Sequence, residues 1–138
     1  MLAQAPVVGF IPIRDMKVAE EFYSGRLGLK VLDRDNPFAL VLEAANGMMI
    51  RCTPVKDAKP QPFTILGWQV PDIHAAAREL IAAGIQPNRY PFLEQDDSGV
   101  WTAPGGSQIL WFNDPDGNVL SLSHHVDAEA PGNEMATG

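Results

Sequence analysis

The chain has 138 residues, of which 46% are hydrophobic and 20% are charged, enough for one compact domain or two small modules. Its net charge of −7 argues against a general nucleic-acid-binding protein, because phosphate binding requires clustered Lys and Arg. Cys52 is the only cysteine, which excludes a disulfide framework and a cysteine-rich zinc site.

The N-terminus and the apolar runs bear on where the protein resides. The first ten residues, MLAQAPVVGF, lack the basic region and the long apolar run of a signal peptide. No apolar run approaches the roughly 20 residues that a membrane-spanning helix needs. A single cysteine also fits a reducing compartment. We therefore expect a cytoplasmic protein that has neither a membrane nor a nucleic acid as partner.

The first half of the chain reads as a strand, a helix and three further strands. Residues 7–13, VVGFIPI, suit a strand, and Asp15 then caps a helix near residues 16–27 that Gly28 ends. Three short strands follow in the sequences KVLDRD, FALVLEA and MMIRCT. The turn at residues 45–47 joins the last two strands as a hairpin, because Asn and Gly tolerate positive φ.

The second half repeats this order after a polar, proline-bearing connector at residues 55–62. The sequence TILGWQV suits a strand, and Asp72 caps a second helix near residues 73–83. We expect a strand or extended segment at about residues 86–93, and a final hairpin formed by SQILWFN and NVLSLSHH. The segment DDSGVWTAPGG, which contains Trp101, is expected to form a flexible flap because it is rich in Gly and Ser.

The two halves match each other as an internal duplication. The sequence IPIRDMKVAEEFY aligns with WQVPDIHAAAREL, and AANGMMIRC aligns with DPDGNVLSL. Two βαβββ modules, at about residues 7–54 and 63–126, predict an α+β fold with residues 127–138 as a flexible tail. Each module is expected to curve its sheet around one helix, which leaves a concave face on the other side.

Three stretches carry a family resemblance. The sequences FIPIRDMKVAEEFYSGRLGL, VPDIHAAARELIAAGI and WFNDPDGNVLSLS resemble the vicinal oxygen chelate superfamily, which includes glyoxalase I, extradiol dioxygenases and the fosfomycin- and bleomycin-resistance proteins. The resemblance covers roughly residues 7–125 and implies a glyoxalase/bleomycin-resistance-like fold whose sheets form a cup. It also implies a homodimer, because members often build the cup from two chains or two modules. This fold serves isomerases, dioxygenases, transferases and simple binding proteins, so it implies no single activity.

The metal-dependent members hold a divalent ion with His or Gln on the first strand of each half and Glu on the last strand, as the resemblance implies. The ion polarises two adjacent substrate oxygens. The matching positions in this chain are Val8, Ile65 and Ser121, none of which carries an imidazole or a carboxylate. A shift of one residue along either first strand recovers no His or Gln. We therefore expect no metal and no other cofactor.

Strand alternation and the flap predict which side chains line the cup. An apolar cavity with a few polar groups is typical of a small-molecule site, although the same aromatic side chains could instead fill a packed core. Arg51 requires an acceptor, which either Glu43 across the hairpin or an anionic ligand could supply. The candidate ligand-binding residues are Phe10, Met49, Arg51, Gln69, Trp101, Trp111 and Ser121.

Two classes of function follow from the sequence. The first is a metal-free protein, similar to the bleomycin-resistance branch, that binds a small aromatic or anionic molecule in an apolar cup. The alternative is a vicinal oxygen chelate enzyme of lyase, isomerase or dioxygenase type, with a substitute metal site built from His124 and Glu43. A structural or regulatory role is a third possibility. The sequence identifies neither the ligand nor a catalytic residue.

Overall fold

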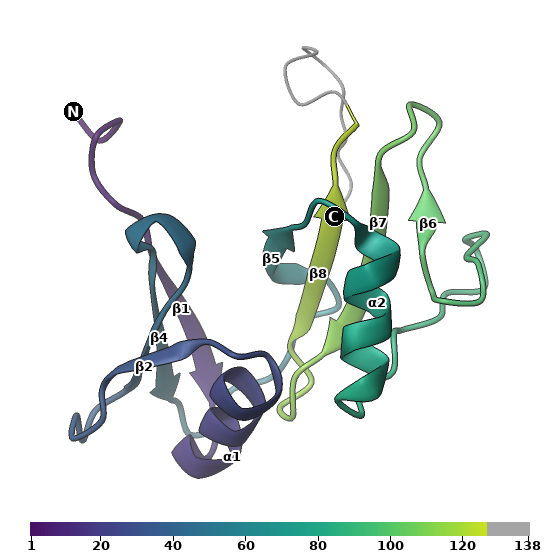
Figure 1. The fold of residues 1–138 in the computed structure, drawn as a ribbon. Helices are drawn as coiled ribbons and strands as arrows, with labels where there is room; N and C mark the ends of the chain where they lie inside the picture. Colours follow the sequence, from purple (N-terminus) through teal and green to yellow (C-terminus); the bar gives the residue numbers. More distant parts are fainter. Residues whose placement is uncertain (127–138) are drawn as a thin grey trace. The chain divides into compact units, whose positions relative to one another are not determined.

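The structure is a computed structural model that describes residues 1–126, so the predicted tail at 127–138 lies outside the described residues. The chain divides into two compact units, Met1–Pro60 and Gln61–Gly138, which we call module 1 and module 2. Each module contains one four-stranded mixed sheet, which confirms the predicted α+β class (Figure 1). Among residues 1–126, no helix has the length and apolar character needed to cross a bilayer.

Module 1 has the predicted order of one strand, a helical segment and three strands. Its strands are β1 (Val8–Ile13), β2 (Lys30–Asp33), β3 (Leu40–Glu43) and β4 (Met49–Pro54). They lie in the order β1-β4-β3-β2, in which β1 and β4 are parallel and the other neighbours are antiparallel. A 3₁₀ turn, η2 (Ala45–Gly47), joins β3 to β4, and Asn46 takes a φ of 61° there, as the hairpin prediction requires.

The predicted helix at residues 16–27 is present in two parts. The Asp15 carboxylate accepts hydrogen bonds from two backbone N–H groups of the first turn, at 2.8 and 3.1 Å, and so caps α1 (Met16–Glu20). The chain then widens into a π-helix, η1 (Glu21–Arg26). Gly28 adopts a φ of 84°, a left-handed conformation that favours glycine and ends the helical segment.

Module 2 repeats the order and the sheet topology. Its elements are β5 (Thr64–Gln69), α2 (Ile73–Ala82), β6 (Trp101–Thr102), β7 (Gln108–Asn113) and β8 (Val119–His124). The strands lie in the order β5-β8-β7-β6, with β5 and β8 parallel. The Asp72 carboxylate caps α2 by accepting a hydrogen bond from the backbone N–H of Ala75 at 3.1 Å.

The third strand of module 2 is not where the sequence predicts it. Residues 86–93 form no strand, and the strand next to β7 is the two-residue β6. Pro87 and Pro91 lack the N–H groups that a continuous ladder would use. The backbone of the segment bonds to β7 where Asn88 N donates to Trp111 O, at 2.7 Å. Trp101 therefore belongs to the sheet and not to a flap outside it.

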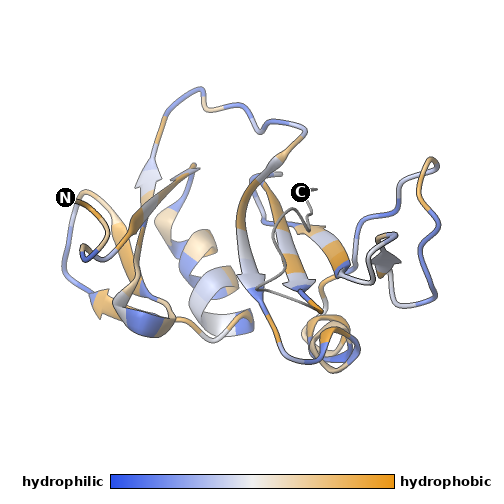
Figure 2. Ribbon diagram, turned by 90° about the horizontal axis from the view of Figure 1, so that it is seen from above, coloured by the Kyte–Doolittle hydropathy of each residue, from blue (hydrophilic) through white to orange (hydrophobic). Residues whose placement is uncertain are grey.

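Each sheet buries one face against its own helix. In module 1, α1 packs on β3 and β4, and the fully buried side chains of this face include Ile11, Leu42, Ile50 and Cys52. In module 2, α2 packs on β7 and β8, above the fully buried Leu110, Phe112 and Leu120. Figure 2 shows the hydrophobic residues gathered on the strands, while the long connections are mainly hydrophilic. Alternation along the strands sends the remaining side chains to the opposite face, which we call the distal face of each module.

Candidate functional site

The distal face of module 1 is apolar and carries one cation at its centre. Arg51 lies on β4 between Phe10 of β1 and Val41 of β3, which are its partners in the strand register. Met49 lies two residues before Arg51 and therefore shares its face. The Phe10 side chain is 67% exposed, whereas Arg51 and Met49 are half-buried.

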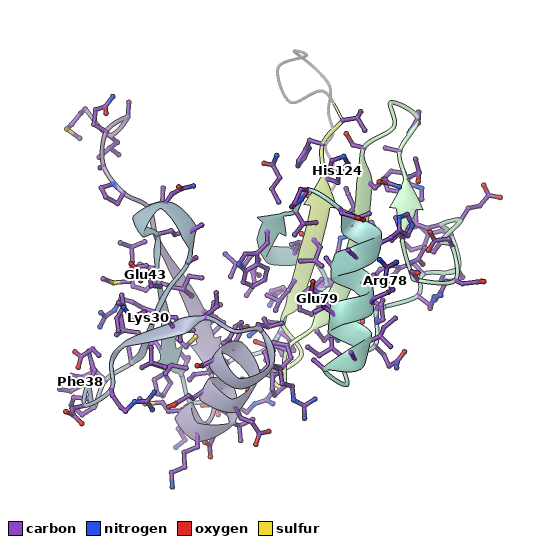
Figure 3. The ribbon with its side chains drawn as sticks, in the orientation of Figure 1. Lys30, Phe38, Glu43, Arg78, Glu79 and His124 are labelled. Atoms are coloured by element: carbon purple, nitrogen blue, oxygen red, sulfur yellow. The ribbon has the colours of Figure 1, made fainter. Side chains whose placement is uncertain are left out.

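Glu43 does not supply the acceptor that Arg51 requires. Glu43 lies opposite Met49 on β4 and opposite Lys30 on β2, so it is displaced by two residues from Arg51 (Figure 3). Within residues 1–126, the Arg51 side chain makes no hydrogen bond and no ion pair. Of the two acceptors that the sequence left open, Glu43 is therefore excluded in this structure.

The distal face of module 2 carries a packed aromatic cluster. Ile109, Trp111 and Val119 form its buried centre, and Tyr90, Leu93 and Trp101 pack against them. The Tyr90 ring meets the Trp111 ring edge-on, with centroids 5.6 Å apart, and the Trp101 ring lies tilted at 6.3 Å from Trp111. Trp111 is only 9% exposed. The packed-core interpretation therefore holds for the centre of this face.

A pocket of about 230 Å³ opens beside this cluster. Its exposed aromatic side chains are Phe63 and Phe92, which are 59% and 79% exposed. Thr64 and Tyr90 supply the only side-chain hydroxyl groups among the lining residues, and no carboxylate, imidazole or thiol lines it. The lining residues are Pro62, Phe63, Thr64, Tyr90, Phe92, Leu93, Trp111 and Val119.

The connection that holds Tyr90 in this pocket is tied together by Gln95. Gln95 Nε2 donates to the carbonyl oxygens of Asn88 and Gly99, at 2.8 and 2.9 Å. Its Oε1 accepts a hydrogen bond from the backbone N–H of Tyr90 at 2.8 Å. All three bonds lie within residues 88–99, so one half-buried side chain closes this connection into a compact loop.

Arg89 and Asp96 complete the loop. The Arg89 guanidinium donates to the carbonyl oxygens of Asp96 and Asp97, at 2.7 and 2.8 Å. The Asp96 carboxylate accepts hydrogen bonds from Ser98 N and Val100 N, both at 2.9 Å. These bonds order the backbone that precedes β6, and thus help to hold Trp101 against the aromatic cluster.

His74 connects the loop to α2. His74 Nε2 lies 2.8 Å from Asp96 Oδ2. Partial burial acts to raise the pKa of Asp96, but the hydrogen bonds from His74, Val100 and Ser98 outweigh burial and hold that pKa below its ordinary value. The charged form of Asp96 is therefore the form that the folded loop stabilises.

Gly67 and Ser121 approach each other closely at the centre of the distal face of module 2. Ser121 pairs with Gly67 on β5 and with Trp111 on β7, and its side chain is buried. A Cβ atom on Gly67 would lie only 2.4 Å from Ser121 Oγ. Glycine is therefore required here because the serine hydroxyl occupies the space above it. Within residues 1–126, the Ser121 hydroxyl makes no hydrogen bond.

Residues 5–122 match the family model described as the Glyoxalase/Bleomycin resistance protein/Dioxygenase superfamily. The chain belongs to this superfamily. The match spans both βαβββ modules, and it agrees with the duplicated topology and with the resemblance that the sequence motifs carry. No curated protein matches the sequence.

Solved structures of superfamily members share the fold. A superfamily member from Sphaerobacter thermophilus DSM 20745 has a TM-score of 0.70 at 20% identity, covering 90% of this chain and 99% of its own. A glyoxalase/bleomycin resistance protein/dioxygenase from Alicyclobacillus acidocaldarius has a TM-score of 0.67 at 21% identity, covering 91% and 94%. A lactoylglutathione lyase from Agrobacterium tumefaciens has a TM-score of 0.66 at 17% identity, covering 88% and 93%. At these identities the likeness shows the fold alone.

The residues at the superfamily's metal positions do not fit a divalent ion. Val8 and Ile65 are hydrocarbon side chains, and Ile65 lies at an irregularity of β5 between Thr64 and Leu66. Ser121 offers a neutral hydroxyl, a poor ligand beside imidazole and carboxylate. Within residues 1–126, no three His, Cys, Asp or Glu side chains come together as a metal-binding group.

The substitute metal site of His124 and Glu43 would draw on both modules and stays a prediction. His124, labelled in Figure 3, places Nδ1 3.1 Å from the carbonyl oxygen of Val70. A histidine that donates Nδ1–H to a carbonyl keeps Nε2 for a metal, but ligation requires further donors. Glu43 belongs to the other module. We derive no chemical step through a metal.

The structure groups the predicted site residues on two faces. Phe10, Met49 and Arg51 share the distal face of module 1, and Gln69, Trp101, Trp111 and Ser121 share that of module 2. A cup that combines both sets stays a prediction. Three aromatic lining residues beside prolines in connections were not predicted, although the sequences QPF and RYPF mark a local apolar patch. They are Phe63, Tyr90 and Phe92, and the aliphatic Leu93 was not predicted either.

Proposed function

We propose that this superfamily member binds a small, flat, mainly apolar molecule in the pocket of module 2, without a bound metal. The observation that supports this proposal is the aromatic lining. The Tyr90 and Trp111 rings define one side of a 230 Å³ pocket, and Phe63 and Phe92 stay exposed beside it. Exposed aromatic rings around a concave apolar site are typical of small-molecule recognition.

The size and chemistry of the pocket restrict the ligand. Drug-sized ligands occupy pockets of roughly 300 to 1,000 Å³, so a pocket of 230 Å³ suits a molecule of one or two fused rings. Thr64 and Tyr90 can each form a hydrogen bond to a polar substituent. The lining residues include no carboxylate, imidazole, thiol or amine, and we propose binding rather than turnover.

Calorimetric titration with indole and 2-naphthol tests the proposal, with cyclohexanol as an aliphatic comparison. We expect the aromatic compounds to bind and cyclohexanol to bind at least about tenfold more weakly, since it lacks a ring face for stacking. The double variant Phe63→Leu/Phe92→Leu should weaken binding about tenfold with little loss of stability, because both side chains are exposed.

Phe38→Leu is the matched control, because Phe38 is 77% exposed and lies in module 1 (Figure 3). Its affinity for indole should equal that of the unmodified protein. Equal weakening by Phe38→Leu, or undiminished binding by the double variant, would remove the pocket from the site. Elemental analysis of the purified protein completes the test, and one transition-metal ion per chain would contradict metal-free binding.

A further inference from the structure

We propose that Arg51 is the centre of a second ligand site, on the distal face of module 1, that binds a planar aromatic carboxylate. The residues of this site all belong to module 1, and the proposal does not rest on the pocket of module 2. Arg51 lies on an inner strand, its side chain makes no hydrogen bond within residues 1–126, and its neighbours are apolar.

Arg51 emerges from the interior of its sheet. The strand order β1-β4-β3-β2 places β4 between two neighbours, so a side chain on its distal face is flanked on both sides. The flanking residues in the register are Phe10 and Val41, and Met49 lies next to Arg51 along the same strand. Arg51 is half-buried in this setting, and the side chains of Phe10 and Val41 offer no oxygen that could accept a hydrogen bond from its guanidinium.

Three other arginines of this chain are either paired with an acceptor or exposed to water. Arg89 donates to two carbonyl oxygens in its loop, and Arg34 pairs with Glu20. Arg78 lies exposed on α2, where water surrounds its charge (Figure 3). Arg51 is instead half-buried, and no acceptor within residues 1–126 bonds to it. Its five N–H donors are therefore available to a ligand.

The surroundings of Arg51 select the ligand class. A guanidinium presents parallel N–H donors that match the two oxygens of a carboxylate. Phe10 is the register neighbour of Arg51, and its exposed ring offers a face for stacking. The Met49 thioether lies on the same face and also packs well against rings. An aryl carboxylate uses the cation and the apolar face together, whereas a free inorganic anion would use the cation alone.

Calorimetric titration with 2-naphthoate tests the site, with 2-naphthol as the neutral analogue and inorganic phosphate as the anion without a ring. We expect 2-naphthoate to bind and phosphate to bind much more weakly. Arg51→Met should weaken 2-naphthoate at least about thirtyfold, in line with the loss of a bidentate charged pair, and should leave 2-naphthol unchanged. The 2-naphthoate affinity of Arg51→Lys should lie between those of the unmodified protein and Arg51→Met, because lysine keeps the charge but lacks the parallel N–H donors.

Arg78→Met is the matched control, since it removes the same charge from an exposed position. Arg78→Met should leave the 2-naphthoate affinity unchanged. The double variant Phe63→Leu/Phe92→Leu should keep the part of the 2-naphthoate affinity that depends on Arg51. Three results would overturn the proposal: no 2-naphthoate binding by the unmodified protein at millimolar concentration, undiminished binding by Arg51→Met, or equal weakening by Arg78→Met. Phosphate binding as strong as that of 2-naphthoate would instead show a simple anion site.

The stability of Arg51→Met provides a readout that does not need a ligand. If the guanidinium is held for a ligand, replacing it with an apolar side chain of similar length should leave the melting temperature unchanged or higher. A clear fall in melting temperature would show that Arg51 has a structural role, and would contradict the proposal.

Discussion

Module 1 and module 2 have the same order of elements and the same sheet topology, yet aromatic side chains on their distal faces differ in exposure. In module 1 the Phe10 side chain is 67% exposed on that face. In module 2 the Trp111 side chain is 9% exposed, because Tyr90, Leu93 and Trp101 pack against it. Part of this difference comes from the strands, because β1 lies at the edge of its sheet whereas β7 lies between two neighbours. Val41, which lies on the inner strand β3 of module 1, is only 3% exposed.

The connection after the helix also differs between the modules. In module 1 only residues 27–29 separate the helical segment from the next strand. In module 2 residues 83–100 occupy that place, and they carry the loop that Gln95 and Arg89 tie together. Two modules with the same order of strands can therefore differ in the length of one connection, and in module 2 the longer connection supplies side chains that pack on the distal face.

The largest expected effect contrasts the covered face with the uncovered one. Trp111→Ala should lower the free energy of unfolding by about 3 to 5 kcal/mol, because it empties the centre of a packed cluster. Phe10→Ala should cost less than about 1 kcal/mol, since most of that side chain already faces water. Urea denaturation of both variants measures the difference. Similar losses in the two variants would break the comparison.

A smaller effect separates the first strands of the two modules. Gly67→Ala should destabilise the protein by about 1 to 3 kcal/mol, because its Cβ would lie 2.4 Å from Ser121 Oγ. Gly9→Ala should stay within about 0.5 kcal/mol, since its Cβ would meet only the flexible end of Met48, at 3.3 Å. Thermal denaturation of the double variant Gly67→Ala/Ser121→Ala provides the check. Recovery of most of the loss is expected, and no recovery would mean that the hydroxyl is not the obstacle.

The smallest effect concerns the loop that distinguishes module 2. The lowered pKa of Asp96 means that its charged form stabilises the fold above the ordinary carboxyl pKa of 3.8, and that this contribution is lost as pH falls through the lowered value. Asp96→Asn should therefore cost less than about 1 kcal/mol at neutral pH, after allowance for solvent screening, and nothing at strongly acidic pH.

The free energy of unfolding, measured from pH 7 down to about pH 2, tests this expectation, because a carboxyl group titrates within roughly this range. Glu20→Gln in module 1 is the control, because the exposed pair of Glu20 with Arg34 closes no loop. It should change stability by no more than about 0.5 kcal/mol. A loss from Asp96→Asn that persists at pH 2 would show that the carboxylate charge is not the cause.

The sequence by itself determined the features that depend on local rules. The Asp15 and Asp72 caps form as predicted, because a capping side chain reaches only its own first turn. The placement of Phe10, Arg51, Trp111 and Ser121 on distal faces also followed from the sequence, since alternate residues of a strand share a face. The duplicated order predicted the α+β fold, because the order of elements can be read without their contacts, and the resemblance of three stretches implied the superfamily.

Only the tertiary structure decided which residues meet. The sequence predicted a strand or extended segment at about residues 86–93. Pairing with β7 depends on a non-local ladder that prolines interrupt, so these residues form no strand and β6 pairs with β7 instead. The sequence alone did not decide whether Glu43 pairs with Arg51. In the structure the register between β3 and β4 places Glu43 opposite Met49, two residues from Arg51, and the two side chains do not pair. The sequence did not predict the contact between the Tyr90 and Trp111 rings. Each outcome depends on packing between segments distant in the chain, which composition and periodicity do not encode.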